Sequence, residues 1–147
     1  MNVLRYIGVY FSKPIWSFIR SCAFWLFRLN KIGQVKKEME ATKGLKIETL
    51  MNLFKWQDDV VGDWTPWVST VIAKDLQDDC DGAAALAKWW FKQHGIKADI
   101  LNLYNSKEGH TVCVAEGIMV SNGNVIKMNT DRDSVLKYFN GEYDTVI

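Results

Sequence analysis

Asp79–His94, with the sequence DCDGAAALAKWWFKQH, is the stretch that decides the fold of this chain. Its run of alanines favours a helix, which we expect from about Cys80 to His94 with Gly95 as the C-cap. Cys80 then lies at the N-terminus of that helix, where the helix dipole and the unpaired N–H groups stabilise a thiolate. The alternative is that Cys80 is an ordinary buried thiol. The small residues of the first turns indicate deep burial.

The segments after this helix have the alternation and turns of an antiparallel sheet. We expect strands at 98–104, 110–115, 118–121 and 125–128, a short helix at 133–139 and a closing strand at 143–147. Before the central helix, 34–42 has the composition of a helix or linker, 47–56 has apolar residues at helical spacing, and 69–74 is a short apolar stretch. Helices first and a sheet second predict the α+β class.

A histidine that could act as a base for the thiol follows 30 residues after Cys80. It lies in Gly109-His110-Thr111-Val112, at the start of a predicted strand. A histidine beside a cysteine can take the thiol proton, so the two residues form a candidate nucleophile and base. The alternative is that His110 is an ordinary strand residue. Asp79 and Asp81 suit a helix N-terminus, but an acid beside the thiol raises its pKa and opposes the dipole.

The order of these motifs resembles the transglutaminase-like cysteine protease superfamily, whose core is papain-like. The resemblance covers 63–129 and begins at the loop Asp63-Trp64; Asp78 departs from it, because many relatives have glycine there. It implies that Cys80 is the nucleophile, that His110 is the general base and acid, and that an Asp or Asn on the next strand is the third member. Asn122 is the first candidate for that member, although Ser-Asn-Gly is also a type I′ turn signal. The other candidates are Asn124, Asn129 and Asp131.

The resemblance implies a cysteine peptidase or transglutaminase-like amidase that acts on a protein or peptide substrate. The Cys80 thiolate would attack a carboxamide carbonyl, and His110 would protonate the departing amine. The Cys80 N–H would bind the oxyanion together with a side chain of Trp64, Gln77 or Gln57. Two alternatives are a catalytically silent binding module that keeps the fold, and an unrelated α+β domain in which Cys80 is structural.

We expect neither a metal nor another cofactor. The possible ligands are Cys80, His94, His110 and Cys113. Residues three apart in a strand point to opposite faces, so His110 and Cys113 cannot easily share a metal ion. His94 suits the C-terminal end of the central helix, where the dipole favours a histidine.

The bulk composition excludes several classes of protein. A chain of 147 residues with 48% apolar residues is the size of one domain. The net charge of +1 argues against a nucleic-acid partner. Three cysteines without a CxxC motif favour a reducing compartment over a disulfide framework. So compact a chain is compatible with a viral or bacterial source.

Residues 1–33 form a basic, aromatic-rich segment that we separate from the α+β domain at 34–147. Its basic residues Arg5, Lys13, Arg20 and Arg28 recur at steps of 8, 7 and 8, which keeps them on one face of a helix that Pro14 divides. A transmembrane helix is disfavoured because no stretch of 18 residues is free of Lys and Arg. A cleaved signal peptide also fits poorly. We expect helices that lie on a membrane surface, or that pack on the domain or on a protein partner.

Overall fold

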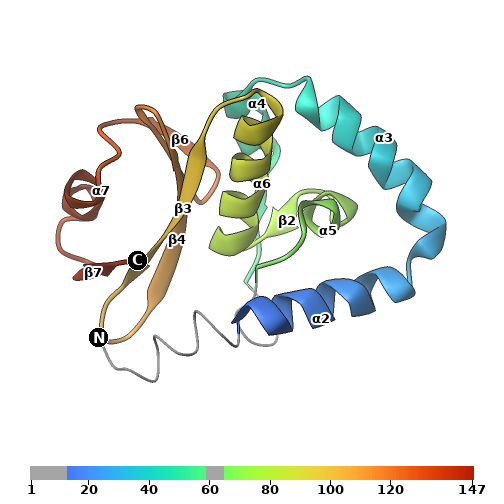
Figure 1. The fold of residues 1–147 in the computed structure, drawn as a ribbon, viewed down its shortest axis with the longest axis horizontal. Coiled ribbons are helices and arrows are strands. Elements are labelled where there is room, and N and C mark those ends of the chain that lie inside the picture. Colours follow the sequence, from blue (N-terminus) through green and yellow to red (C-terminus); the bar gives the residue numbers. More distant parts are fainter. Residues whose placement is uncertain (1–12, 59–64) are drawn as a thin grey trace.

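The structure is a computed structural model and describes residues 13–58 and 65–147. It has the α+β architecture that the sequence predicts, with a five-stranded antiparallel sheet between layers of helices (Figure 1). Helices α2 to α6 lie on one side of the sheet and α7 lies on the other. Their bounds in the first half of the chain are α2 Lys13–Leu26, the 3-10 helix η2 Leu29–Lys31, α3 Ile32–Lys43, α4 Ile47–Leu53 and α5 Val68–Ala73.

The central helix α6 spans Cys80–Gln93 and packs across the sheet. Alanines make this close approach possible, since Ala83, Ala84 and Ala87 are buried together with Leu86 and Phe91. The C-cap is His94 rather than the predicted Gly95, which instead follows with a φ of +71°. Glycine adopts that left-handed conformation without strain, so Gly95 terminates the helix from the position directly after the C-cap.

The sheet has the strand order β6-β5-β4-β3-β7. Its strands are β3 Ala98–Tyr104, β4 Gly109–Ala115, β5 Ile118–Ser121, β6 Asn124–Lys127 and β7 Thr145–Val146. Each of the first four lies within one residue of its predicted bounds, whereas β7 is shorter than expected. In the β5–β6 hairpin Ser121 pairs with Asn124, so Asn122 and Gly123 form the turn with φ values of +48° and +81°. This is the type I′ turn that Asn-Gly favours.

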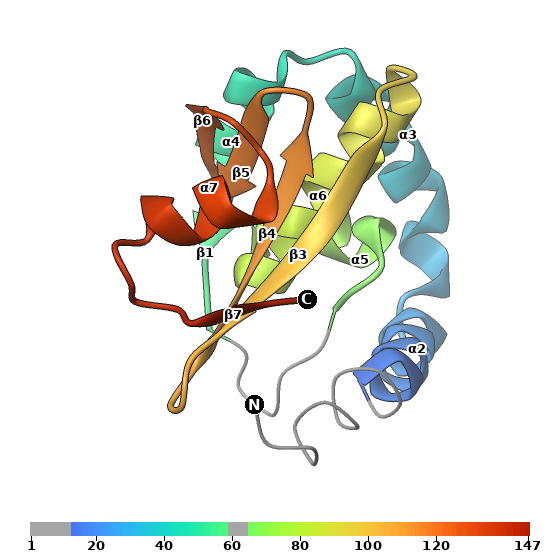
Figure 2. The same ribbon diagram turned by 60° about the vertical axis from the view of Figure 1, so that its left-hand side comes forward.

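Two apolar cores cover the two faces of the sheet. The first includes Leu86 and Phe91 of α6 together with Cys113 and Ala115 of β4. The second includes Val112 of β4 and Val135 of α7, which spans Arg132–Tyr138. Figure 2 shows α7 in front of the sheet and α6 behind it. Successive residues of β4 therefore point alternately toward α6 and toward α7.

A two-stranded parallel pair, β1 Lys55–Trp56 and β2 Gln77–Asp78, was not predicted from the sequence. Strands of two residues are too short for an alternating pattern to show. Lys55 pairs with Gln77 in this small sheet. The pair holds the chain directly before α6 and so fixes where Cys80 begins the helix.

The N-terminal segment forms helix α2 in the part that the structure describes. Pro14 lies in the first turn of α2, where a proline is tolerated because its missing N–H has no helical partner. None of the described helices is long and apolar enough to cross a membrane.

Candidate active site

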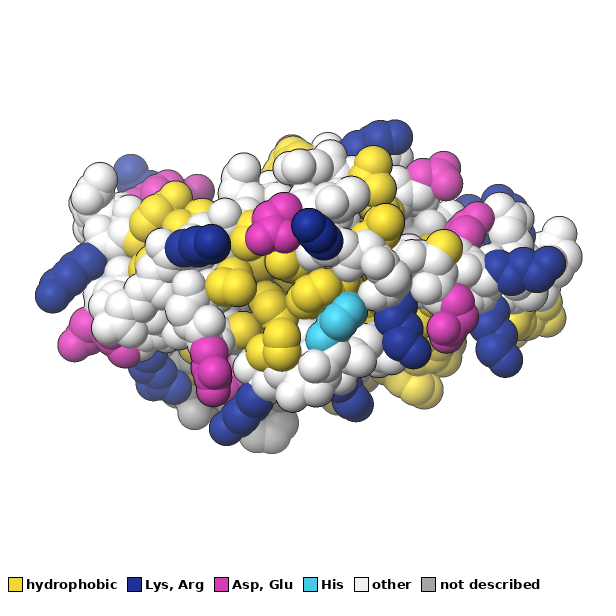
Figure 3. Space-filling view, turned by 90° about the horizontal axis from the view of Figure 1, so that it is seen from above, with side chains coloured by type: hydrophobic (Ala, Val, Ile, Leu, Met, Phe, Trp, Pro, Cys, Tyr) yellow, Lys and Arg dark blue, Asp and Glu magenta, His cyan; other side chains and the backbone are white. Residues whose placement is uncertain are grey.

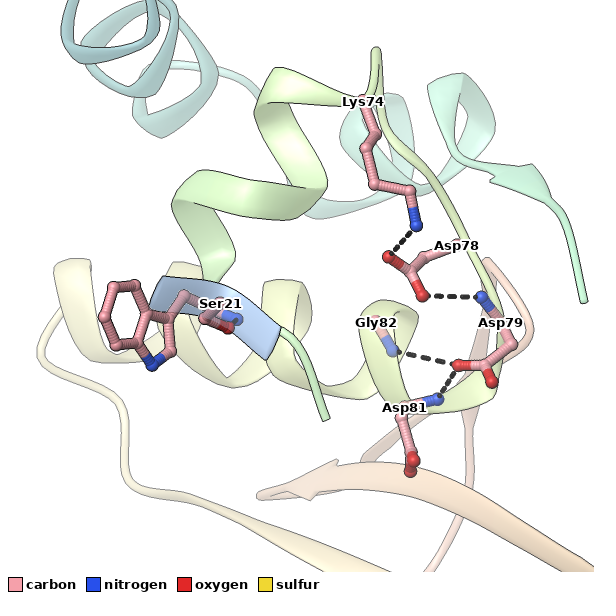
Figure 4. A network of polar contacts seen from close by, with 7 residues as sticks. Ser21, Lys74, Asp78, Asp79, Asp81 and Gly82 are labelled. Carbon is pink, nitrogen blue, oxygen red and sulfur yellow. Dashed lines mark hydrogen bonds and ion pairs between the residues drawn. The ribbon is translucent and has the colours of Figure 1, made fainter. Parts of the chain in front are cut away.

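Asp79 is the N-cap of α6 and determines how the helix begins. Its Oδ1 accepts hydrogen bonds from the backbone N–H groups of Asp81, at 2.9 Å, and Gly82, at 3.5 Å (Figure 4). These two bonds satisfy N–H groups that have no partner within the helix, and they place a negative charge at the positive end of the dipole. Cys80 is consequently the first helical residue and is partly exposed, as a nucleophile must be.

Asp78 is fully buried beneath the start of α6. Its carboxylate forms an ion pair with Lys74 Nζ at 2.8 Å and accepts the N–H of Asp79 at 3.0 Å. A Cβ on Gly82 would lie 2.3 Å from Cβ of Asp78, which is far inside contact distance. The glycine at position 82 therefore makes room for the aspartate at position 78.

Asp81 adds a third carboxylate to this region. It is buried, and its side chain points toward the sheet (Figure 4). Of the three carboxylates, Asp78 is balanced by Lys74 and Asp79 by the helix N–H groups. Two of the three acids around Cys80 thus have their charges compensated locally.

His110 lies on β4 and is buried among aromatic rings. Phe139 meets the imidazole edge-on at 5.5 Å between ring centroids, and Tyr143 stacks on it at 5.9 Å. Burial lowers the pKa of His110 below its ordinary value, and the charge of Glu108 opposes this only in part. A neutral imidazole is the form that can accept a proton from a thiol.

The hydrogen-bond partner of His110 is Ser121, whose Oγ lies 2.9 Å from Nε2. Ser121 ends β5 and is buried. A hydroxyl both donates and accepts, so it can serve either neutral tautomer of the ring. Ser121, rather than one of the predicted Asn or Asp candidates, is therefore the hydrogen-bond partner of the imidazole.

The predicted third member, Asn122, lies one residue further along, in the β5–β6 turn, with an exposed side chain. Asn124 opens β6 and is also exposed. Asn129 precedes α7, and Asp131 is the N-cap of that helix and accepts from the N–H of Ser134. Strand alternation explains the difference, because only every second residue of β5 shares a face with His110.

Alternation also places the side chain of His110 on the α7 face of the sheet, with Val112 and Val114. The side chains of β4 that contact α6 are those of the opposite set, which includes Cys113 and Ala115. His110 and Cys113 therefore lie on opposite faces, as their spacing predicts. Cys80 and His110 therefore belong to elements that approach the sheet from opposite faces, and α6 and β4 both begin toward the same end of the sheet (Figures 1 and 2).

Tyr143 is a further neighbour of His110, and its ring stacks on the imidazole. Burial, together with the nearby charges of Glu142, Glu108 and Cys80, raises the pKa of Tyr143 to about 12. Sequence reasoning missed this residue, since a tyrosine before the last strand carries no motif.

The predicted oxyanion donors are only partly located. Gln77 lies in β2, three residues before Cys80, and its side chain is half-buried. Gln57 follows β1 and is exposed. Trp64 lies outside the described residues. Asp79 accepts from the N–H groups of Asp81 and Gly82, so these two first-turn donors are already engaged.

The other side chains that were considered as possible metal ligands are dispersed in the fold. Cys113 is fully buried in the first core, and burial raises the pKa of its thiol to about 12. His94 is at the far end of α6, where its Nδ1 lies 2.8 Å from the carbonyl of Trp90. Within residues 13–58 and 65–147, no three His, Cys, Asp or Glu side chains are grouped so that they could hold a metal ion.

Comparison of the chain with protein-family models, curated proteins and solved structures finds no match in any of the three. The function must therefore be argued from the residues of this site.

Proposed function

We propose that this chain is a thiol-dependent acyl-transfer enzyme with a papain-like core, which acts on a peptide or glutamine amide and most often hydrolyses it. Cys80 is the nucleophile and His110 is the general base and acid. The observation that carries the proposal is the partly exposed thiol of Cys80 at the N-terminus of α6, where the helix dipole stabilises a thiolate.

The chemistry follows from the protonation states. His110 takes the Cys80 proton, and the thiolate adds to the amide carbonyl while the Cys80 N–H holds the developing oxyanion. Collapse of this intermediate breaks the C–N bond, and the imidazolium gives its proton to the departing amine. Water, deprotonated by His110, then hydrolyses the thioester. An amine in place of water would give transamidation.

Ser121 is a positioning residue in this scheme. Its hydroxyl at 2.9 Å fixes the orientation of the imidazole from Nε2, which leaves Nδ1 as the ring nitrogen that would exchange the proton. A serine carries no charge, so it stabilises the imidazolium less than an aspartate would.

The first test measures the pH dependence of iodoacetamide alkylation at each cysteine by peptide mass spectrometry. The three cysteines of the chain provide internal controls, because Cys22 is partly exposed and Cys113 is buried. We expect Cys80 to react fast well below pH 8.5, the approximate pKa of an ordinary thiol, and His110→Gln to abolish this advantage. Cys113 should stay unmodified in both proteins, which verifies that the variant is folded.

The second test uses a glutaminyl peptide and measures ammonia release and peptide cleavage. Cys80→Ala should abolish turnover, and Cys22→Ala should leave it unchanged. Undiminished turnover in Cys80→Ala would overturn the mechanism.

A catalytically silent binding module is the second candidate. The placement of the His110 side chain on the α7 face, closed in by Phe139 and Tyr143, favours it. In that case Cys80 would alkylate no faster than Cys22, and His110→Gln would lower stability without changing thiol reactivity.

A further inference from the structure

Helix α2 is attached to the rest of the molecule through its polar side. Ser17 Oγ accepts the N–H of Thr65 at 2.9 Å, and Ser21 Oγ accepts the N–H of Trp67 at 3.3 Å. Both serines are buried, and Ser21 is 0% exposed. In an amphipathic helix on a globular domain the apolar side normally faces the core. Here the small hydroxyl side chains of Ser17 and Ser21 take much of that place, beside Trp25, which packs against the first core.

Most of the large apolar side chains of α2 face outward as a result. Trp16 is 58% exposed, and the neighbouring Ile15, Phe18, Ile19 and Leu26 are similarly open. At about 100° per residue these side chains share one broad arc of the helix. The surface continues past the helix end through Phe27, which is 85% exposed, Leu29 and Ile32. We call this set, from Ile15 to Ile32, the outer face of α2. So large an exposed apolar surface marks an interaction site.

The charged residues of the segment that carries the outer face are all basic. Residues 1–37 contain seven of the 18 Lys and Arg residues and none of the 17 Asp and Glu residues. The other 110 residues hold 11 basic and 17 acidic residues, so the two parts have opposite net charges of +7 and −6. On the side of the molecule opposite α2, by contrast, side chains of both charges are interspersed around an apolar centre (Figure 3).

These features favour one occupant. An apolar face with aromatic side chains and flanking basic residues matches the interface of an anionic bilayer, where aromatic rings lie at headgroup level and Lys and Arg contact phosphate. A second copy of the chain fits less well, because self-pairing of this face would bring two sets of basic residues together with no acid in 1–37 to compensate them. None of the described helices can span a bilayer, so α2 would lie in the plane of the surface.

We propose that the outer face of α2 docks this molecule on the surface of a membrane that contains anionic phospholipid. The serine side of α2 holds the domain, and the apolar side enters the interface. Both expectations for the N-terminal segment, packing on the domain and lying on a membrane, then apply to opposite sides of one helix. This proposal does not depend on the enzymatic one.

The test is co-sedimentation of the full chain with vesicles of phosphatidylcholine containing about one third phosphatidylglycerol, compared with pure phosphatidylcholine. We expect binding to the anionic vesicles that weakens as salt is raised to about 1 M, where the Debye length falls to about 3 Å. Trp16→Ala should lower the partition coefficient about ten-fold. Trp56→Ala is the matched control, because Trp56 is 49% exposed but lies on β1, away from α2 (Figure 2).

The charge contribution has its own pair of variants. Lys31→Ala, beside Leu29 and Ile32, should weaken binding to the anionic vesicles about five-fold. Lys92→Ala, near the far end of α6, should leave it unchanged. Circular dichroism and thermal midpoints equal to those of the wild type establish that the four variants are folded.

Three results would overturn the proposal. The first is no binding to anionic vesicles, and the second is equal loss in Trp16→Ala and Trp56→Ala. The third is a dimer in sedimentation velocity that Trp16→Ala dissociates while vesicles capture nothing, which would make the outer face an interface between copies. Binding to neutral vesicles as strong as to anionic ones, unaffected by Lys31→Ala, would overturn the role of anionic lipid.

Discussion

At the scale of single residues, the contact between His110 and Ser121 is the feature on which the candidate site depends. The imidazole is buried, so its ring nitrogen needs a polar partner, and the Ser121 hydroxyl at 2.9 Å supplies it. The adjacent Asn122 has a different task, because its φ of +48° belongs to the left-handed region that asparagine tolerates in a tight turn. Ser121 is thus the hydrogen-bond partner of His110, and the neighbouring Asn122 forms the turn.

Replacement of these two residues separates the roles. Ser121→Ala leaves the buried ring nitrogen without its partner and should lower the free energy of unfolding by about 1–3 kcal/mol. Asn122→Gly removes the side chain but keeps a residue suited to positive φ, so it should change that free energy by less than about 0.5 kcal/mol. Urea unfolding followed by fluorescence measures both. A larger loss in Asn122→Gly would show that the asparagine side chain is the one that matters.

At the scale of elements, the start of α6 shows how a helix accommodates acids beneath its first turn. Asp78 lies under that turn with Lys74, and Asp79 caps it. The arrangement requires close approach of the helix backbone, which only the absence of a side chain at Gly82 permits. The helix start and the buried ion pair are therefore one structural unit.

Alanine substitution at two helical glycines tests this unit. Gly82→Ala places a Cβ 2.3 Å from Asp78, so we expect a loss of about 1–3 kcal/mol in the free energy of unfolding. Gly33→Ala in α3 is the control, because no atom lies within 4 Å of its added Cβ. It should be neutral or stabilising by up to about 1 kcal/mol. Chemical denaturation measures the free energy of unfolding of both variants. Equal values for Gly82→Ala and Gly33→Ala would mean that Asp78 moves away from the added Cβ without cost.

At the scale of the whole molecule, local patterns predicted the sheet and α6 well, because alternation, alanine content and turn residues act over short stretches. Relations between distant segments were not predictable. Ser121 and Tyr143 reach His110 only through strand pairing, and β1 meets β2 only through the tertiary fold. The serine side of α2 was likewise hidden, since nothing in the sequence tells which side of an amphipathic helix meets the domain.

The burial of His110 makes the stability of the whole molecule depend on pH. An unfolded histidine has a pKa of about 6.5, and burial in the fold lowers that of His110. Above pH 6.5 or so neither state is protonated, and the neutral ring contributes its full stability. As pH falls below that value the unfolded chain binds the proton first, so the free energy of unfolding decreases until the folded pKa has been passed.

Two histidine variants isolate this contribution, because His94 is the other histidine of the chain. In His110→Gln we expect the free energy of unfolding to lose the part of its decrease that begins as pH falls below about 6.5. His94→Gln changes an exposed side chain and should retain that decrease. In His94→Gln the imidazole protons of His110 are the only ones left, so NMR titration measures its pKa directly. A midpoint at or above about 6.5 would contradict the burial of a neutral ring and would remove the reason to regard His110 as a ready base.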